Sequence, residues 1–164
     1  MAILAPNSLE LFSRSPEQTR RLGMRFGALL SEGDIVLFHG DLGAGKTTFI
    51  QGIAQGWGSI DPVTSPTFVL INEYRRPDGN ILFHMDAYRV SSIYEAEDLD
   101  LERMYLSGAL LVEWAERIED ILPTERLLID LKYISEETRR MTLIPTGERY
   151  RKIVDRFRKR SFGV

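Results

Sequence analysis

One short segment carries the clearest chemistry in this sequence: Gly40-Asp41-Leu42-Gly43-Ala44-Gly45-Lys46-Thr47. It fits G-x-x-x-x-G-K-[ST], the pattern of a phosphate-binding loop. Glycine reaches backbone angles that are closed to other residues, and its missing side chain lets successive amide N–H groups converge on phosphate oxygens. Lys46 would then contact the β- and γ-phosphates, and the Thr47 hydroxyl would ligate Mg²⁺. The pattern therefore predicts binding of a nucleoside triphosphate.

The loop has the neighbours that such a motif requires. An apolar run, 35–38, precedes it, and a stretch with helical periodicity, 48–57, follows it. The first turn of that helix would add its positive dipole end to the phosphate site. A glycine-rich turn that only joins a strand to a helix is the alternative, but a chance match to the full pattern is rare at ordinary glycine content.

A phosphate loop needs a carboxylate to complete its magnesium site, usually at the end of a neighbouring apolar strand. Asp86 follows the run 81–85, and Glu113 follows the run 109–112. Because the carboxyl ends of parallel strands meet at one edge of a sheet, both side chains are candidates. Asp86 could instead cap a helix or close a turn, whereas glutamate is a poor N-cap residue.

The segment Ser65-Pro66-Thr67-Phe68 is a second candidate for function. A threonine in a loop after the phosphate-loop helix can ligate Mg²⁺ or sense the γ-phosphate, as switch loops do. The structural alternative is a proline turn that enters a strand. We hypothesise that Asp86 or Thr67 orients the attacking water, and we interpret His84 as a satisfied core residue.

The remaining pattern alternates strands and helices. Ser15 and Pro16 are typical of a helix start, and we expect that helix to continue until Gly33. Pro77-Asp78-Gly79 predicts a hairpin turn between strands over 68–75 and 80–85. The other expected elements are a helix over 92–105, a buried strand over 109–112, a short helix over 114–122, strands over 127–133 and 141–144, and a helix from about residue 148.

These elements predict the α/β class, with one P-loop NTPase domain built on a mixed, mostly parallel sheet that contains an antiparallel hairpin and is flanked by helices. We assign residues 1–145 to the P-loop ATPase domain and 146–164 to a basic C-terminal helix or tail of the same domain. The chain has no cysteine, which excludes disulfides and thiolate metal sites. No apolar run reaches the roughly 20 residues of a membrane span, so we expect a cytoplasmic protein without membrane contact.

Charge is unevenly distributed along the chain. Residues 1–138 carry 12 Lys and Arg against 22 Asp and Glu, whereas residues 139–164 carry nine against two. Such asymmetry can mark a surface for nucleic acid or a partner. A helix held against the protein's own acidic face would have the same composition, and the sequence leaves both interpretations open.

Four segments in this order and spacing resemble the TsaE family, also called YjeE, of bacterial P-loop ATPases. They are GDLGAGKTT at 40–48, SPTF at 65–68, HMDAYR at 84–89 and LVEW at 111–114. The resemblance runs from about residue 15 to 140, and the basic tail departs from it. It implies the ATPase component of the machinery that makes threonylcarbamoyladenosine (t6A) in tRNA, with ATP and Mg²⁺ as cofactors. It also implies TsaB and TsaD as partner proteins, with tRNA reached through their complex.

The resemblance and the chemistry above together give a set of expected site residues. The resemblance implies that Thr47 and Glu113 would hold the metal. Our own hypothesis makes Lys46, Asp86 and Thr67 the catalytic residues. The nucleotide would be held by Asp41, Leu42, Gly43, Ala44, Gly45, Lys46, Thr47 and Thr48, with Trp114 beside them and Arg139 nearby.

The choice of base and the use made of ATP rest on weaker signals. No N-K-x-D stretch follows the last strands, and in this loop class that tetrad reads guanine, so we expect ATP. One alternative function is a nucleotide-gated assembly module with little turnover of its own. Another is a small P-loop kinase, which needs an arginine-rich lid, whereas segment 86–108 is acidic.

Overall fold

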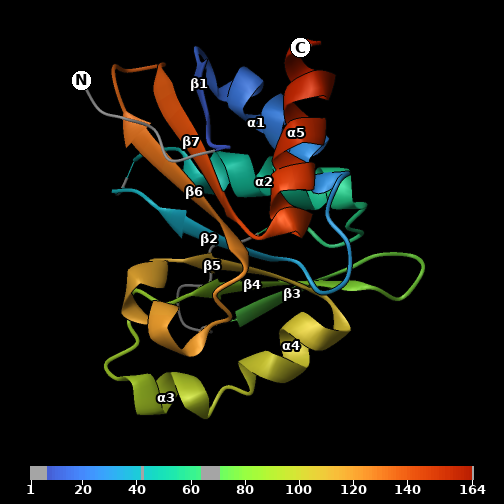
Figure 1. The fold of residues 1–164 in the computed structure, drawn as a ribbon, viewed down its shortest axis with the longest axis vertical. Coiled ribbons are helices and arrows are strands. Elements are labelled where there is room, and N and C mark those ends of the chain that lie inside the picture. Colours follow the sequence, from blue (N-terminus) through green and yellow to red (C-terminus); the bar gives the residue numbers. More distant parts are fainter. Residues whose placement is uncertain (1–6, 42, 64–70, 164) are drawn as a thin grey trace.

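The computed structural model describes residues 7–41, 43–63 and 71–163. Within these residues seven strands form one sheet, in the order β1-β7-β6-β2-β5-β4-β3, with helices on both faces (Figure 1). The strands are β1 (Leu9–Ser13), β2 (Ile35–His39), β3 (Ile71–Arg75), β4 (Ile81–Asp86), β5 (Ala109–Glu113), β6 (Arg126–Tyr133) and β7 (Arg139–Thr146). The helices are α1 (Pro16–Gly27), α2 (Lys46–Trp57), α3 (Ile93–Glu97), α4 (Leu101–Ser107) and α5 (Glu148–Phe162), with the 3₁₀ turns η1 (Ala115–Arg117) and η2 (Glu119–Ile121).

The sheet confirms the predicted α/β class. Its centre is parallel, because β2 pairs in parallel with β5 and β6, and β5 pairs in parallel with β4. The predicted hairpin is the antiparallel pair β3 and β4. Strand β1 is not among the elements expected from the sequence, and neither is the antiparallel position of β7 between β1 and β6.

Alternation along β2 divides the core into two layers. Val36 and Phe38 face a cluster with the buried side chains of α1, α2 and α5, whereas Ile35 and Leu37 face a cluster with those of α3 and α4. All four side chains are at most 2% exposed. Each contributes about 1.5–3 kcal/mol by burial, which explains why this strand is a continuous apolar run.

Helices α1 and α2 cross at backbone contact. A Cβ atom placed on Gly27 would lie 2.1 Å from the carbonyl oxygen of Ile53, and one on Gly52 would lie 2.1 Å from that of Arg20. Gly23 and Gly56 are equally crowded by the opposite helix. Since no other residue fits in these positions, glycine is what allows α1 to lie directly on the helix that follows the phosphate loop.

Three helix predictions were wrong in their bounds. Helix α1 ends at Gly27 rather than near Gly33, because the amides of residues 29 and 30 bond to the carbonyls of residues 26 and 27 in a closing 3₁₀-type turn. The helix expected over 92–105 is divided into α3 and α4, since Asp100 adopts the left-handed conformation with φ 56°. The short helix expected after Trp114 is the pair η1 and η2, in which Ile118 bonds back to Ala115.

The ends of the longer helices agree with their sequence signals. The Oγ of Ser15 accepts the amide N–H of Gln18, which caps α1 as Ser15 and Pro16 predict. Helix α5 begins at Glu148, as expected from the basic C-terminal pattern. In the described part of the chain, no helix combines the length and the apolar character needed to cross a bilayer.

Candidate functional site

The phosphate-binding loop joins β2 to α2, as its motif predicts. Gly43 and Gly45 have φ angles of 80° and 95°, which L-residues with a side chain rarely adopt. The loop is closed by the amide of Ala44, which donates to the carbonyl of Asp41 at 3.1 Å. Because α2 begins at Lys46, directly after the loop, the N–H groups of its first turn point toward the loop, as anion binding requires.

Lys46 opens α2 and is only 6% exposed. Its Nζ donates to the carbonyl oxygen of Gly40 at 2.6 Å and lies 4.2 Å from the centre of the Trp114 ring. Burial lowers the pKa of the Lys46 ammonium, and the carboxylates around it, first among them Glu113, act in the opposite direction. The loop thus holds its one ammonium group in a protected position, close to acidic side chains.

Both candidate metal carboxylates lie at the same edge of the sheet. Strands β4 and β5 are parallel neighbours, and their register places Asp86 opposite Glu113. On the other side of β5, Glu113 is opposite Phe38, near the end of the strand that enters the phosphate loop. Burial raises the pKa of Asp86, and the nearby charge of Glu113 raises it further. The Asp86 carboxylate also accepts a hydrogen bond from the amide N–H of Tyr88 at 2.9 Å. Asp86 therefore also closes a turn, which is the structural alternative that its sequence position suggested.

Glu113 is held by a buried chain of polar groups. Its Oε2 lies 2.8 Å from Nε2 of His84, and Nδ1 of the same ring lies 2.8 Å from the hydroxyl of Tyr74. His84 is 2% and Glu113 8% exposed. His84 is therefore the satisfied core residue that the sequence indicated, and it also orients a carboxylate of the site. Tyr74 gave no functional signal in the sequence, because only the register of β3 on β4 brings it opposite Leu82 and beside His84.

A cavity of about 340 Å³ collects most of these groups. Its size lies within the range of ligand pockets. It is lined by Gly43, Gly45, Lys46, Thr47, Thr48, Asp86, Glu113, Trp114 and Arg139. Of the other predicted residues, Ala44 is buried and Asp41 is exposed at the start of the loop. Leu42 and Thr67, with the rest of the segment 65–68, lie outside the described residues.

Arg139 enters the cavity from β7, far from the loop in sequence. Its Cγ would lie 3.6 Å from a Cβ placed on Gly45. Its Nη1 donates to the carbonyls of Ser135 and Thr138, while its Nε is buried and has no hydrogen-bond partner among the described residues. A buried donor without a partner is costly, and it marks a place where an anionic ligand would be stabilised.

The oxygen donors fit magnesium held together with a nucleotide. Thr47, Asp86 and Glu113 offer hydroxyl and carboxylate oxygens, the ligands that Mg²⁺ prefers. Among the residues that the structure describes, no three acidic or histidine side chains gather closely enough to hold a metal ion by themselves. Mg²⁺ in phosphate-transfer sites is usually bound by one or two protein ligands, by water and by the phosphates of the nucleotide, and this donor set has that form.

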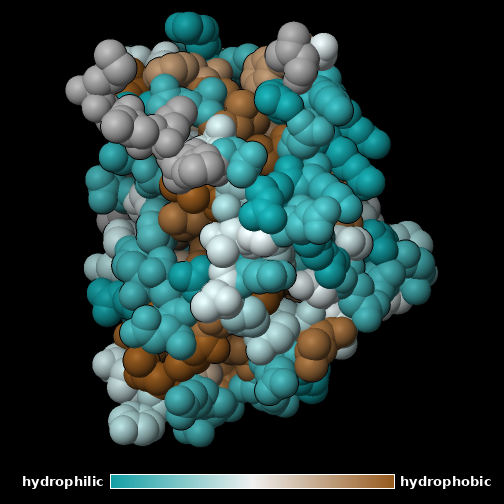
Figure 2. All heavy atoms as spheres, viewed as in Figure 1, coloured by the Kyte–Doolittle hydropathy of each residue, from teal (hydrophilic) through white to brown (hydrophobic). Residues whose placement is uncertain are grey.

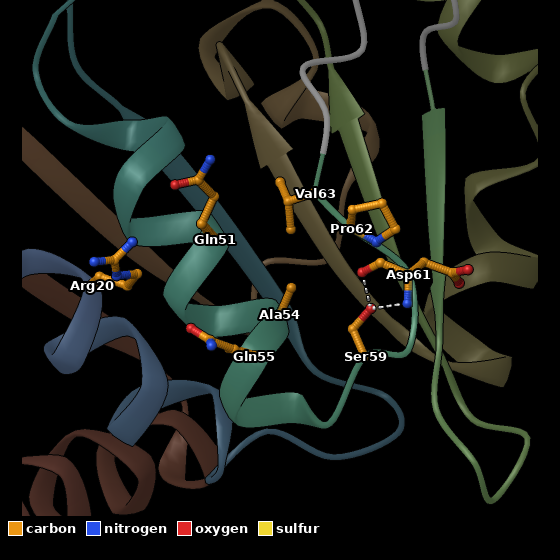
Figure 3. A pocket seen from close by; sticks show the side chains of 8 residues that line it. All are labelled: Arg20, Gln51, Ala54, Gln55, Ser59, Asp61, Pro62 and Val63. Carbon is orange, nitrogen blue, oxygen red and sulfur yellow. Dashed lines mark hydrogen bonds between the residues drawn. The ribbon is translucent and has the colours of Figure 1, made fainter.

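A second cavity of similar size, about 320 Å³, lies farther along α2, between this helix and the segment 59–63 (Figure 3). It is bounded by Gln51 and Gln55 of α2, by Arg20 of α1 and by the segment 59–63. Its one carboxylate, Asp61, is engaged by Arg75, which holds the pKa of Asp61 at about 2. This cavity has neither a glycine loop nor a buried ammonium group, so the two cavities differ in chemistry and not in volume.

Comparison with known proteins agrees with this geometry. Residues 13–141 match the family described as "Threonylcarbamoyl adenosine biosynthesis protein TsaE". The chain is similar to the tRNA threonylcarbamoyladenosine biosynthesis protein TsaE of Bacillus subtilis, with 44% identity over 83% of this chain and 85% of that protein. It is 38% identical to the protein of the same name from Treponema pallidum, over 80% of this chain and 96% of the other. The crystal structure of B. subtilis YdiB superposes with a TM-score of 0.78 and 36% identity, covering 94% of this chain and 96% of that one.

Proposed function

The chain belongs to the TsaE family of threonylcarbamoyl adenosine biosynthesis proteins, and from this premise we propose that it binds Mg·ATP and hydrolyses it as the ATPase component of t6A synthesis. Its partners in this proposal are TsaB and TsaD, which bring the tRNA. The observation that carries the proposal is the cavity in which Lys46 of the loop, the Thr47 hydroxyl and the carboxylates of Asp86 and Glu113 come together.

Each residue has a chemical task in this proposal. Lys46 would exchange its hydrogen bond to the neutral Gly40 carbonyl for phosphate oxygens, because a bond between an ammonium group and an anion is the stronger one. Thr47 and Glu113 hold the metal ion, which when bound spreads the charge that develops on the transferred phosphoryl group. Arg139 supplies its free Nε to the same anion.

Hydrolysis then requires only that one water be oriented in line with the leaving group. Asp86 is suited to this task because burial raises its pKa, and a carboxylate with a raised pKa is a better proton acceptor. Thr67, which lies outside the described residues, is the second candidate. Phosphoryl transfer to water needs no covalent nucleophile, so the absence of cysteine from the chain does not limit it.

The decisive experiment measures ATP turnover by the full chain, alone and with the TsaB–TsaD pair. We expect slow turnover that rises when the pair is added, and tighter binding of ATP than of GTP in a competition assay. If the pair leaves turnover unchanged while nucleotide alters the stability of the complex, the protein acts as a nucleotide-gated assembly module. Tighter binding of GTP would overturn the assignment of the base.

A further inference from the structure

The basic C-terminal helix does not lie on the acidic part of the protein. Helix α5 packs against α1 and β7, and Phe157 contacts Phe26 edge-to-face at 5.8 Å. The acidic segment 93–107 forms α3 and α4, which cover the opposite face of the sheet (Figure 1). The structure therefore favours a free basic surface over a helix neutralised by its own acidic face, the alternative that the sequence left open.

The basic side chains of α5 form a stripe along one flank of the helix. Arg149, Lys152, Arg156 and Arg160 recur every three or four residues, which places them on one side of a helix. The stripe is about 16 Å long at 1.5 Å per residue. Side chains along α5 are hydrophilic on the outer surface (Figure 2).

The stripe borders a hollow between α5 and the end of α1. This hollow, here called the α1–α5 groove, has a volume of about 410 Å³ and is lined by Leu29, Ser31, Glu148, Arg149, Lys152, Ile153 and Arg156. On α1, Arg21 and Arg25 are both exposed and lie one helical turn apart, so they share one side of the helix that ends next to the groove.

Half of the stripe is free to meet an external partner, and a third cation is only loosely held. Arg149 is used internally, because its Nε lies 2.6 Å from the buried Asp34 and it donates to the carbonyl of Glu32. Lys152 has a loose, exposed contact with Glu148 at 3.4 Å. Arg156 and Arg160 have no acidic partner among the described residues. An exposed ion pair such as that of Lys152 with Glu148 contributes little to stability, so Lys152 can readily bind another anion instead.

We propose that the α1–α5 groove binds the phosphate backbone of RNA. A row of cations along a helix is the electrostatic footprint of a polyanion, and it neutralises successive phosphates without reading sequence. A membrane surface fits less well, because interfacial helices combine their basic residues with a broad apolar face, whereas the apolar face of α5 is buried against α1 and the sheet. The choice of RNA as the polyanion rests on the proposed role in tRNA modification.

The test uses the full chain and a fluorescently labelled, unmodified tRNA transcript, with binding followed by anisotropy at several KCl concentrations. The groove variant is Lys152→Gln with Arg156→Gln. The matched control is Arg151→Gln with Arg158→Gln, which removes the same charge from the opposite flank of the same helix. We expect the groove variant to bind roughly tenfold more weakly at low salt, with the slope of log K against log [salt] reduced by about two. The control should stay within about twofold of the wild type.

Equal loss in both variants, or no binding of RNA by the wild type, would overturn the proposal. Binding to vesicles that contain anionic phospholipid, without binding to RNA, would also overturn it. Mg·ATP binding is measured in the same samples, because it reports on the proposed function separately. The groove variant should bind ATP as the wild type does. A protein that binds RNA through the groove but binds no nucleotide would refute the ATPase proposal and leave this one standing.

Discussion

The two halves of the candidate site are built in different ways. The phosphate half is one continuous segment, in which Gly43, Gly45 and Lys46 take their positions from local backbone geometry. The carboxylate half is assembled from separate strands, because Asp86 and Glu113 meet only through the register of β4 on β5. The first half is set by a turn and the second by a sheet, so the second depends on residues well outside the site, such as Tyr74.

The sharpest test of the phosphate half is Lys46→Ala. It removes the ammonium group that would meet the phosphates, and loss of a charged hydrogen bond costs about 3 kcal/mol, or roughly a 100-fold loss of ATP affinity. Turnover should be abolished. Titration calorimetry and an ATPase assay check this, with Lys152→Ala as a lysine control outside the cavity. Wild-type ATPase activity in Lys46→Ala would refute the site.

The carboxylate half is tested by Glu113→Gln, which keeps the shape of the side chain and removes its charge. We expect ATP binding without metal to change little and the Mg²⁺ concentration for half-maximal turnover to rise by about 10- to 100-fold. Asp86→Asn should reduce turnover more than it changes the metal requirement. If Glu113→Gln keeps the wild-type metal requirement and Asp86→Asn loses it, the ligand role belongs to Asp86.

His84→Gln tests how far metal binding by the carboxylate half depends on the buried His84 and Tyr74 that hold Glu113. It breaks the ring bridge between Tyr74 and Glu113, and we expect about a tenfold loss in apparent Mg²⁺ affinity with ATP affinity nearly unchanged. Thermal unfolding should show a loss of about 1–3 kcal/mol, since a buried polar group is left without its partner. Tyr74→Phe is the milder comparison, because it leaves the contact between His84 and Glu113 in place. An unchanged metal affinity in His84→Gln would reduce His84 to a packing role.

The smallest expected effect is on the pH dependence of ATP binding. Phosphates favour charged Lys46, so its pKa is higher in the complex than in the free protein, where burial lowers it. The contribution of the Lys46 ammonium to ATP binding is therefore complete at a pH below the pKa of Lys46 in the free protein. It declines as the pH rises from there toward the pKa of Lys46 in the complex. We expect a few-fold decline that begins below the ordinary lysine range. Lys46→Arg, which keeps its charge, should lack this decline, and calorimetry across alkaline pH would detect it.

The same contrast explains which parts of the site could be predicted from the sequence. The loop is a local pattern whose residue types follow from the backbone angles that it needs, so its position between β2 and α2 was predicted correctly. Glu113 and Asp86 were identifiable because each follows an apolar run. Their position at one edge of the sheet was expected from the ends of parallel strands. Their exact pairing and the support of Glu113 by His84 depend on strand register, which no local pattern encodes.

The fold was predictable to a similar degree. The parallel centre, the hairpin and the N-cap of α1 follow from periodicity and turn chemistry. Strand β1 was missed because it is a short edge strand that depends on pairing with β7. The break at Asp100 was missed because the helical pattern continues through this residue, although aspartate is one of the few non-glycine residues that adopt the left-handed conformation.

The glycine contacts between α1 and α2 have a mechanical consequence. Carbonyl oxygens of each helix are seated where the other helix has no side chain, so the two helices cannot slide past one another without backbone collision. A displacement of α1 would therefore move α2 with it, including the first turn that carries Lys46 and Thr47. A molecule that binds the outer surface of α1 would thus act on the Lys46 ammonium and the Thr47 hydroxyl.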